Sequence, residues 1–210
     1  MTEPFAARDG VEAGRLPKSV VAQRGGVGAG DSTVNHAALA EDLEQARGEL
    51  HRLLGDAERT DAWTTPTRGT RRTNEQLLFH MVFGYMIVQR LLPLVRVLGR
   101  FPDGVSLIYA RLLDAATRPF DLINYYGSHT AALVYNRHRM GTKMNRVIAS
   151  LQCSLMRSTD EALRRGMHFP TQWDSFVNDY MTLEDVYRYP GQHFDFHQRQ
   201  LTLNPEPGNG

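Results

Sequence analysis

The chain is poor in cysteine, since Cys153 is the only one among its 210 residues. A single thiol excludes an internal disulfide bond, and a reducing compartment is the natural setting for such a chain. We therefore expect a cytoplasmic protein. Nothing around Cys153 in the sequence marks it as a nucleophile, so we interpret it as a packing residue of a helix.

An excess of charge of either sign is also missing. The 24 Lys and Arg residues nearly balance the 23 Asp and Glu residues, which leaves a formal net charge of +1 at pH 7. A chain without a basic surplus or a basic aromatic stripe has no electrostatic reason to seek nucleic acid or an anionic membrane. We expect neither partner, and a nucleic-acid-binding stress protein is a poor interpretation of this composition.

Long apolar runs are absent as well. The least charged run extends from Gln76 to Gln89, and at about 14 residues it is too short to span a bilayer. The first residues include Glu3, Arg8 and Asp9 and contain no apolar run, so we expect no secretory signal there. These absences favour a soluble protein.

Residues 1–33 have the composition of a flexible tail, with the glycine-rich stretch Gly25–Gly30 near their end. That stretch lacks the Gly-Lys-Ser/Thr ending of a phosphate-binding loop and has no strand before it, so we interpret it as a linker. We predict a single domain over residues 34–203, followed by a second flexible tail at 204–210.

Apolar residues recur at helical spacing in several segments, and no segment shows the alternation of a strand. The first helix is predicted from Val34, capped within residues 31–33, and is expected to end near Gly55. Thr73 with Gln76 forms a capping box for the second helix. The pattern therefore predicts an all-α fold.

Two further helices follow in the second half of the chain. The third is predicted from Met144 to Leu163 and is stopped by Gly166. Thr182 begins the last helical region. The helix that carries His193 and His197 is expected to start or restart at Pro190, because proline fits the first turn of a helix better than its interior. Four such helices can form an up-down four-helix bundle.

The connection between the second and third helices is long, from Gly99 to about Arg139. It contains a short helical pattern at residues 107–113 and an aromatic cluster at residues 120–126. A connection of this length usually has structure or a function of its own. It is either a lid over a pocket or a packing insertion, and we favour the insertion.

His193 and His197 lie one helical turn apart, so their imidazoles share one face and can bind one metal ion. The alternative is a pair of surface or core histidines. His80 falls within the apolar face of the second helix and must be satisfied there by a hydrogen bond or by a metal. His51, within the first helix, is interpreted as solvated or half-buried. Facing helices of a bundle can bring His80 to the histidine pair.

This combination resembles the DinB family, also called the DinB/YfiT-like metalloenzymes. The resemblance rests on Asn74-Glu75-Gln76-Leu77-Leu78-Phe79-His80 and on His193-x-x-x-His197-x-x-Gln200-Leu201, within residues 34–203. It implies a four-helix bundle, here with an unusually long connection between helices 2 and 3. It also implies that His80, His193 and His197 bind a divalent metal ion.

A three-histidine site suits zinc, nickel, iron or copper, and it leaves a position open for water or substrate. The resemblance implies either a small-thiol S-transferase that uses a thiol of the mycothiol or bacillithiol type, or a metal-dependent hydrolase. A small molecule is then the substrate, and a homodimer is expected. The alternative is a non-catalytic, dimeric metal-binding bundle with a binding or stress-response role. Asp195 points to another face of its helix, which favours an indirect or solvent-facing role.

Overall fold

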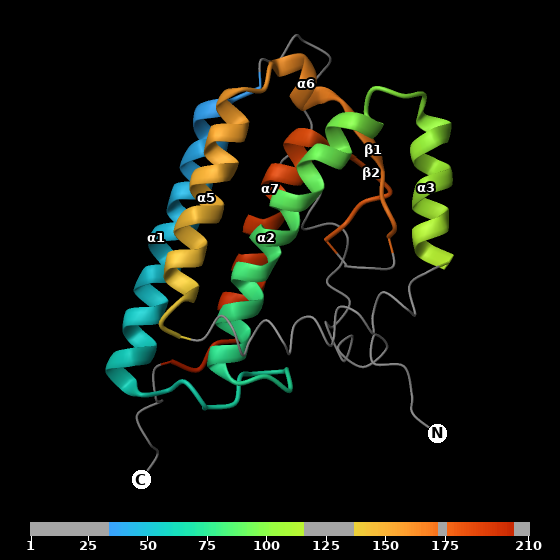
Figure 1. The fold of residues 1–210 in the computed structure, drawn as a ribbon. Coiled ribbons are helices and arrows are strands. Elements are labelled where there is room, and N and C mark those ends of the chain that lie inside the picture. Colours follow the sequence, from blue (N-terminus) through green and yellow to red (C-terminus); the bar gives the residue numbers. More distant parts are fainter. Residues whose placement is uncertain (1–33, 116–136, 172–175, 204–210) are drawn as a thin grey trace, which may run out of the picture.

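The computed structural model describes residues 34–115, 137–171 and 176–203, and these are mainly helical (Figure 1). The helices and strands are α1 (His36–Thr60), α2 (Asn74–Leu98), α3 (Asp103–Ala115), α5 (Met140–Met156), α6 (Asp160–Arg164), β1 (Gly166–His168), β2 (Tyr180–Thr182) and α7 (Leu183–Gln198). The predicted helical class is confirmed, with a small antiparallel β1–β2 pair added to it. The predicted tails and the aromatic cluster at 120–126 lie outside the described residues.

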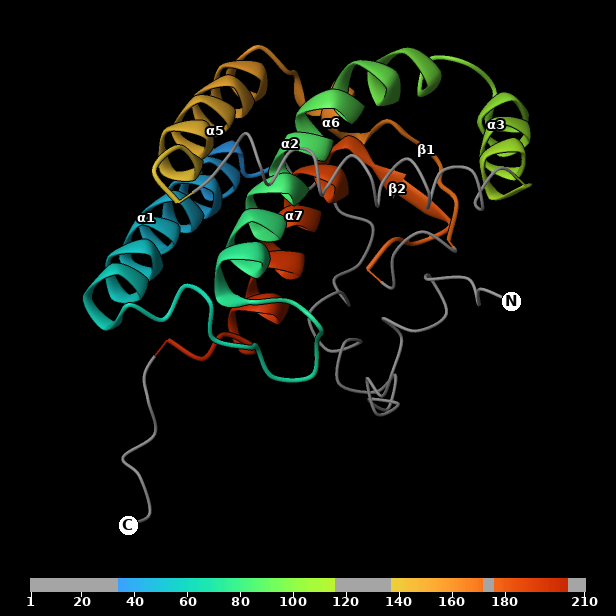
Figure 2. The same cartoon turned by 60° about the horizontal axis from the view of Figure 1, so that its bottom comes forward.

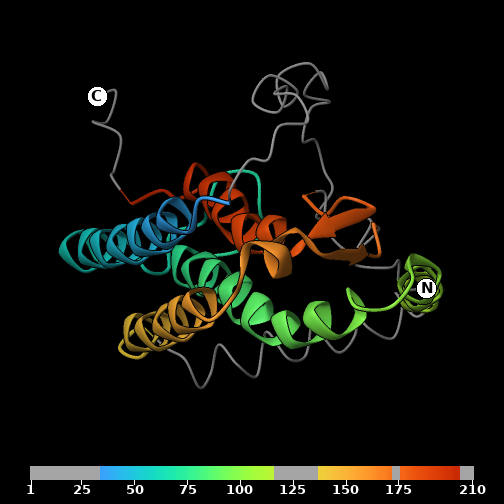
Figure 3. The same cartoon turned by 90° about the horizontal axis from the view of Figure 1, so that it is seen from above.

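Four long helices account for most of the packing. α2 contacts α5 and α7, and α1 contacts the same two helices. Figures 1 and 2 show α1 and α5 running side by side, with α2 and α7 forming a second pair. Seen from above, α3 lies on the far side of α2 from α1 and α5 (Figure 3), and it packs against β1. This arrangement places α2 directly against α7.

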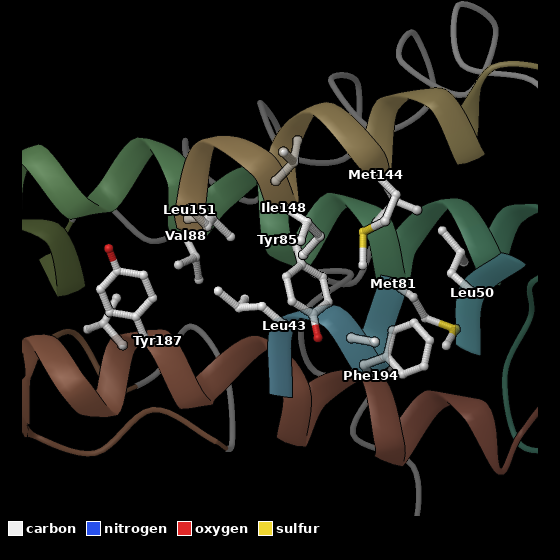
Figure 4. Packing of buried hydrophobic residues seen from close by; sticks show 14 of the residues in the cluster. Leu43, Leu50, Met81, Tyr85, Val88, Met144, Ile148, Leu151, Tyr187 and Phe194 are labelled. Carbon is white, nitrogen blue, oxygen red and sulfur yellow. The ribbon is translucent and has the colours of Figure 1, made fainter. Parts of the chain in front are cut away.

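The core lies between these four helices, and Figure 4 shows part of it. Its side chains are mostly aliphatic and methionine, with a few aromatic rings; the largest that are fully buried are Tyr85, Leu39, Leu50, Leu77, Leu78, Met81, Met140, Met144, Ile148, Leu151, Leu155 and Leu163. Each such side chain contributes about 1.5–3 kcal/mol when removed from water. The predicted apolar face of the second helix is confirmed, because Leu77, Met81 and Val88 are 0% exposed.

The prediction that the first helix ends near Gly55 is wrong. α1 continues to Thr60 and ends at Asp61, which adopts a left-handed conformation (φ 49°). Ala57 is 0% exposed, so its burial in the core stabilises the turn that follows Gly55. A helical glycine costs only about 1 kcal/mol relative to alanine, which this packing offsets. At the other end the cap is Asn35, whose side chain accepts a hydrogen bond from the Ala38 amide (2.9 Å), and not a residue of 31–33.

The predicted third helix is split into two. α5 ends at Met156, and α6 restarts at Asp160 with Thr159 as its cap. Gly166 does not cap a helix but begins β1, where it faces Thr182. A Cβ atom at Gly166 would lie 2.5 Å from the Met181 carbonyl oxygen, closer than any side chain tolerates. Glycine is therefore required there by the close approach of two strands.

The prediction that Pro190 starts the last helix is also wrong. α7 begins at Leu183 and runs through Pro190 without interruption. Its start is set by the Thr182–Asp185 capping box, in which the Thr182 hydroxyl accepts from the Asp185 amide (3.1 Å). An internal proline costs about 3 kcal/mol. Tyr187 and Phe194, on either side of Pro190, are buried, and the free energy of their burial offsets the cost of the proline.

α3 confirms the short helix predicted within the long connection; Ala110 of the predicted pattern is buried, but the helix also carries a second, exposed row of apolar residues. Val105, Ile108 and Leu112 are 43%, 62% and 64% exposed, and they follow one another at helical spacing.

Cys153 is exposed on α5, so its interpretation as a packing residue is wrong.

Among the described helices, α2 is long and apolar enough to cross a membrane on length and composition alone. The sequence-based expectation considered a shorter run, ending at Gln89, and missed this. The core helix of a soluble protein passes the same test. The contacts of α2 with α5 and α7 bury part of its apolar surface.

Asn74 ties the start of α2 to the end of the chain's last described segment. Its side-chain amide donates to the Ala62 carbonyl (2.8 Å), and its side-chain oxygen accepts from the Thr202 amide (3.0 Å). Asn74 is 0% exposed, and its hydrogen bond to the Ala62 carbonyl is buried. Asn74 therefore holds the segment after α7 against the first turn of α2.

We expect Asn74→Ala to lower the free energy of unfolding by about 2–4 kcal/mol, because it leaves the buried Ala62 carbonyl and the partly buried Thr202 amide without this partner. Urea denaturation followed by circular dichroism measures this. Gln76→Ala, which removes only the solvent-exposed part of the adjacent capping box, is the matched control and should cost about 1 kcal/mol or less. Equal losses in the two variants would contradict the role given to Asn74.

Candidate metal centre

The three predicted histidines come together where α2 faces α7. The ring centroids of His80 and His193 are 4.9 Å apart, those of His80 and His197 are 4.8 Å apart, and those of His193 and His197 are 4.4 Å apart. One nitrogen from each ring lies within 4.8 Å of the other two. Two nitrogens bound to one zinc ion are roughly 3.4 Å apart in tetrahedral geometry, so a small movement of the rings suffices to hold an ion.

Local helix geometry produces this cluster. His193 and His197 are one turn apart on α7, and their rings therefore point to the same side. On α2, His80 shares a face with Leu77 and Gly84, three residues before it and four after it. The capping boxes at Thr73 and Thr182 set where the two helices begin, and hence which face each turns to the other.

His197 is oriented by a residue beyond the end of its helix. The Nδ1 atom of His197 lies 2.7 Å from the Oε1 atom of Gln200. When Nδ1 carries the proton and donates to this oxygen, Nε2 is left as the ligand atom. A hydrogen bond on the non-ligating nitrogen is a usual feature of metal-binding histidines, because it fixes the tautomer and the plane of the ring.

His80 is held in its neutral form. Burial lowers the pKa of His80 well below its ordinary value, and the positive charge of Arg72 lowers it further, with smaller effects from His193 and His197. A neutral imidazole is the form that binds a metal ion. The donor set therefore fits a metal ion at neutral pH.

A close approach between the two helices makes room for His193. A Cβ atom on Gly84 would lie 3.2 Å from Nδ1 of His193 and 3.6 Å from its Cε1. His193 is 5% exposed. Any residue larger than glycine at position 84 would therefore press on the imidazole ring.

Aromatic rings surround the histidines on the other sides. The ring centroid of Phe176 lies 6.3 Å from that of His193, and the centroid of Tyr189 lies 6.1 Å from it. Phe196 is 5.2 Å from His197 and 5.4 Å from Phe176, by the same measure. This apolar shell lowers the local polarity, which strengthens electrostatic interactions at the cluster.

The other candidate residues lie away from the cluster. His51 is exposed on α1 and its Nε2 atom is 2.8 Å from Oδ1 of Asn145, in agreement with the solvated interpretation. Asp195 lies on another face of α7, as predicted, and lines a cleft between α7 and α1. None of the three clustered histidines lines that cleft.

Sequence reasoning missed Gly84 and the aromatic shell as parts of the site, and it named Gln200 in the closing motif without the hydrogen bond that Gln200 forms with His197. Gln200 was signalled by its position three residues after His197. Gly84 was signalled by its place on the same helix face as His80, but only the helix packing shows what it touches.

Comparison with family models, with curated proteins and with solved structures finds no match for this chain.

Proposed function

We propose that the chain is a divalent-metal-dependent enzyme of the DinB-like type, with His80, His193 and His197 as its metal ligands. The observation that carries this proposal is the convergence of three imidazole nitrogens, from two helices far apart in the sequence, within 4.8 Å. The mutual contacts of α1, α2, α5 and α7 support the further proposal that these helices form the up-down four-helix bundle of that family.

Among enzyme activities, we favour transfer of a small thiol over hydrolysis. A metal ion bound here would act as a Lewis acid that lowers the pKa of a coordinated thiol or water. The nearby charge of Arg72, which already influences His80, favours an anionic group at the site. Small cytoplasmic thiols of the mycothiol and bacillithiol type offer such a group as their thiolate. The metal is zinc, nickel or iron, in keeping with an all-imidazole donor set.

The test is a thiol-transfer assay on metal-loaded protein. Mycothiol or bacillithiol is supplied with an alkylating electrophile, and thiol consumption is followed against the uncatalysed rate. We expect an acceleration of at least about 100-fold, which is modest for an enzyme. His197→Ala should abolish the acceleration, and His51→Ala should leave it intact. An ester panel, run in parallel with the same two variants, tests the hydrolase.

A second candidate is a non-catalytic bundle in which the metal is structural. The observation that favours it is the tight enclosure of His193, which is 5% exposed and lies close to Phe176 and Tyr189. Its signature is a lower Tm after chelation, together with no turnover in any thiol or ester assay.

A homodimer remains part of both proposals, and sedimentation equilibrium measures the mass of the assembly.

A further inference from the structure

A second site lies on the other side of α7 from the histidines. A cleft of about 480 Å³ opens between α1 and α7, a volume within the usual range for a small-molecule site. Polar side chains dominate its lining, and Leu43, Ala46 and Phe194 add apolar surface. None of these residues contributes to the histidine cluster.

A buried tyrosine reaches into this cleft from α2. Tyr85 is 1% exposed, and its hydroxyl is directed toward α1 and α7 (Figure 4). Gly191 stands opposite, and a Cβ atom there would lie 3.9 Å from the Tyr85 oxygen. Within residues 34–115, 137–171 and 176–203, no group forms a hydrogen bond with this hydroxyl, and its oxygen is not among the enclosed unpaired atoms, so it is open to the cleft. Water that enters the cleft can reach this oxygen, and a bound polar group can take the place of that water.

Carboxylates surround the mouth of the cleft. Asp42, Glu49 and Asp195 line it, with Arg188 as the one guanidinium among the lining residues. Arg188 lies closer to Glu184 (2.9 Å), outside the cleft, than to Asp42 (3.4 Å).

The three carboxylates are not equally engaged. Glu49 accepts from Arg52 (2.6 Å), so its charge is largely compensated. Asp195 has no ion pair within 4 Å in the part of the chain that the structure describes, although Arg199 lies one turn away along the helix. The cleft therefore offers the uncompensated negative charge of Asp195 beside a hydroxyl that is open to a ligand.

We propose that this cleft binds an aliphatic primary amine. The ammonium group donates hydrogen bonds to the Tyr85 hydroxyl oxygen and to the carboxylates of Asp195 and Asp42, which matches its three donors. The methylene chain lies over Leu43, Ala46 and Phe194. Burial raises the pKa of Tyr85, and the charges of Asp195 and Asp42 raise it further, so the phenol keeps its proton at neutral pH.

This site stands independently of the metal centre. Its lining residues are drawn from α1, α2 and α7, and the histidine cluster uses the opposite face of α7. Failure to find a metal would therefore leave the amine site untouched.

The test is isothermal titration calorimetry of the full chain with three probes of equal length: 1,4-diaminobutane, butane-1,4-diol and succinate. We expect the diamine to bind at least tenfold more tightly than the diol, and succinate not to bind. Tyr85→Phe, which removes only the hydroxyl, should weaken diamine binding about fivefold, the value of one hydrogen bond. Asp195→Asn, on the exposed rim, should weaken it by about the same factor and reduce its dependence on salt.

Glu161→Gln is the control, because Glu161 is an exposed carboxylate that pairs with Arg165 (2.5 Å) and lies on α6, which contributes no residue to the lining of the cleft. It should bind the diamine as the wild type does. The proposal is overturned if the diol binds as tightly as the diamine, or if Tyr85→Phe and Asp195→Asn both bind the diamine with wild-type affinity. Circular dichroism of each variant establishes that the fold is retained, and Asp195→Asn alone decides the matter if Tyr85→Phe does not fold.

Discussion

Protein carrying His193→Ala should purify with less than about a tenth of a metal ion per chain, whereas the wild type should hold close to one. Removing one of three ligands leaves two imidazoles, and we expect the affinity to fall by more than about 100-fold, since even the loss of an outer hydrogen bond costs 10–100-fold. Elemental analysis by plasma mass spectrometry, on protein purified without a polyhistidine tag, measures the content and identifies the ion.

His80→Ala and His197→Ala should show the same loss as His193→Ala. These variants separate ligand loss from misfolding, because three substitutions at different positions on α2 and α7 are not expected to damage the fold equally, whereas each removes one ligand. His51→Ala is the matched control, an exposed histidine on α1 that bonds to Asn145. Negligible metal in the wild type, or a content that the three substitutions leave unchanged, would rule out the centre.

Gly84→Ala should weaken metal binding about tenfold or more without altering any ligand. The added methyl carbon would stand 3.2 Å from Nδ1 of His193, so the ring must move by a few tenths of an ångström away from its place beside His80. A displacement of this size takes up much of the roughly 0.5 Å within which a metal site must hold its ligands, and it moves the ring away from the other two ligands. Competition against a chromophoric chelator measures the change in affinity.

Gly55→Ala is the control for this prediction. Both glycines lie within long helices, and both substitutions gain up to about 1 kcal/mol in helix propensity. A Cβ atom at Gly55 would meet nothing within 4 Å. Gly55→Ala should therefore keep the wild-type affinity for metal. If Gly84→Ala binds metal as tightly as Gly55→Ala does, the steric role of Gly84 is refuted.

The metal centre and the cleft use opposite faces of α7. One face of the helix presents His193 and His197 to α2, and the opposite face presents Asp195 to the cleft beside α1. Phe194, between them, is buried and contacts the ring of Tyr85, with centroids 6.3 Å apart. A ligand in the cleft and an ion at the histidines would thus contact opposite faces of the same turns of α7.

The sequence by itself determined the elements that carry the candidate site. The capping boxes at Thr73 and Thr182 are local hydrogen-bond patterns, so they were readable without the fold. The spacing of His193 and His197, and the place of His80 on an apolar face, follow from the helical repeat. All three predictions depend on residues within one or two turns of each other.

Only the tertiary structure decided what lies across from those residues. Pro190 and Gly55 look like helix boundaries in the sequence, but α7 and α1 continue through them because packing on both sides offsets the local cost. Gly166 looks like a helix stop, and instead allows two strands to approach. The contact of Gly84 with His193 and the open hydroxyl of Tyr85 depend on the distance between α2 and α7, which is set by the summed packing of the core and by no local pattern.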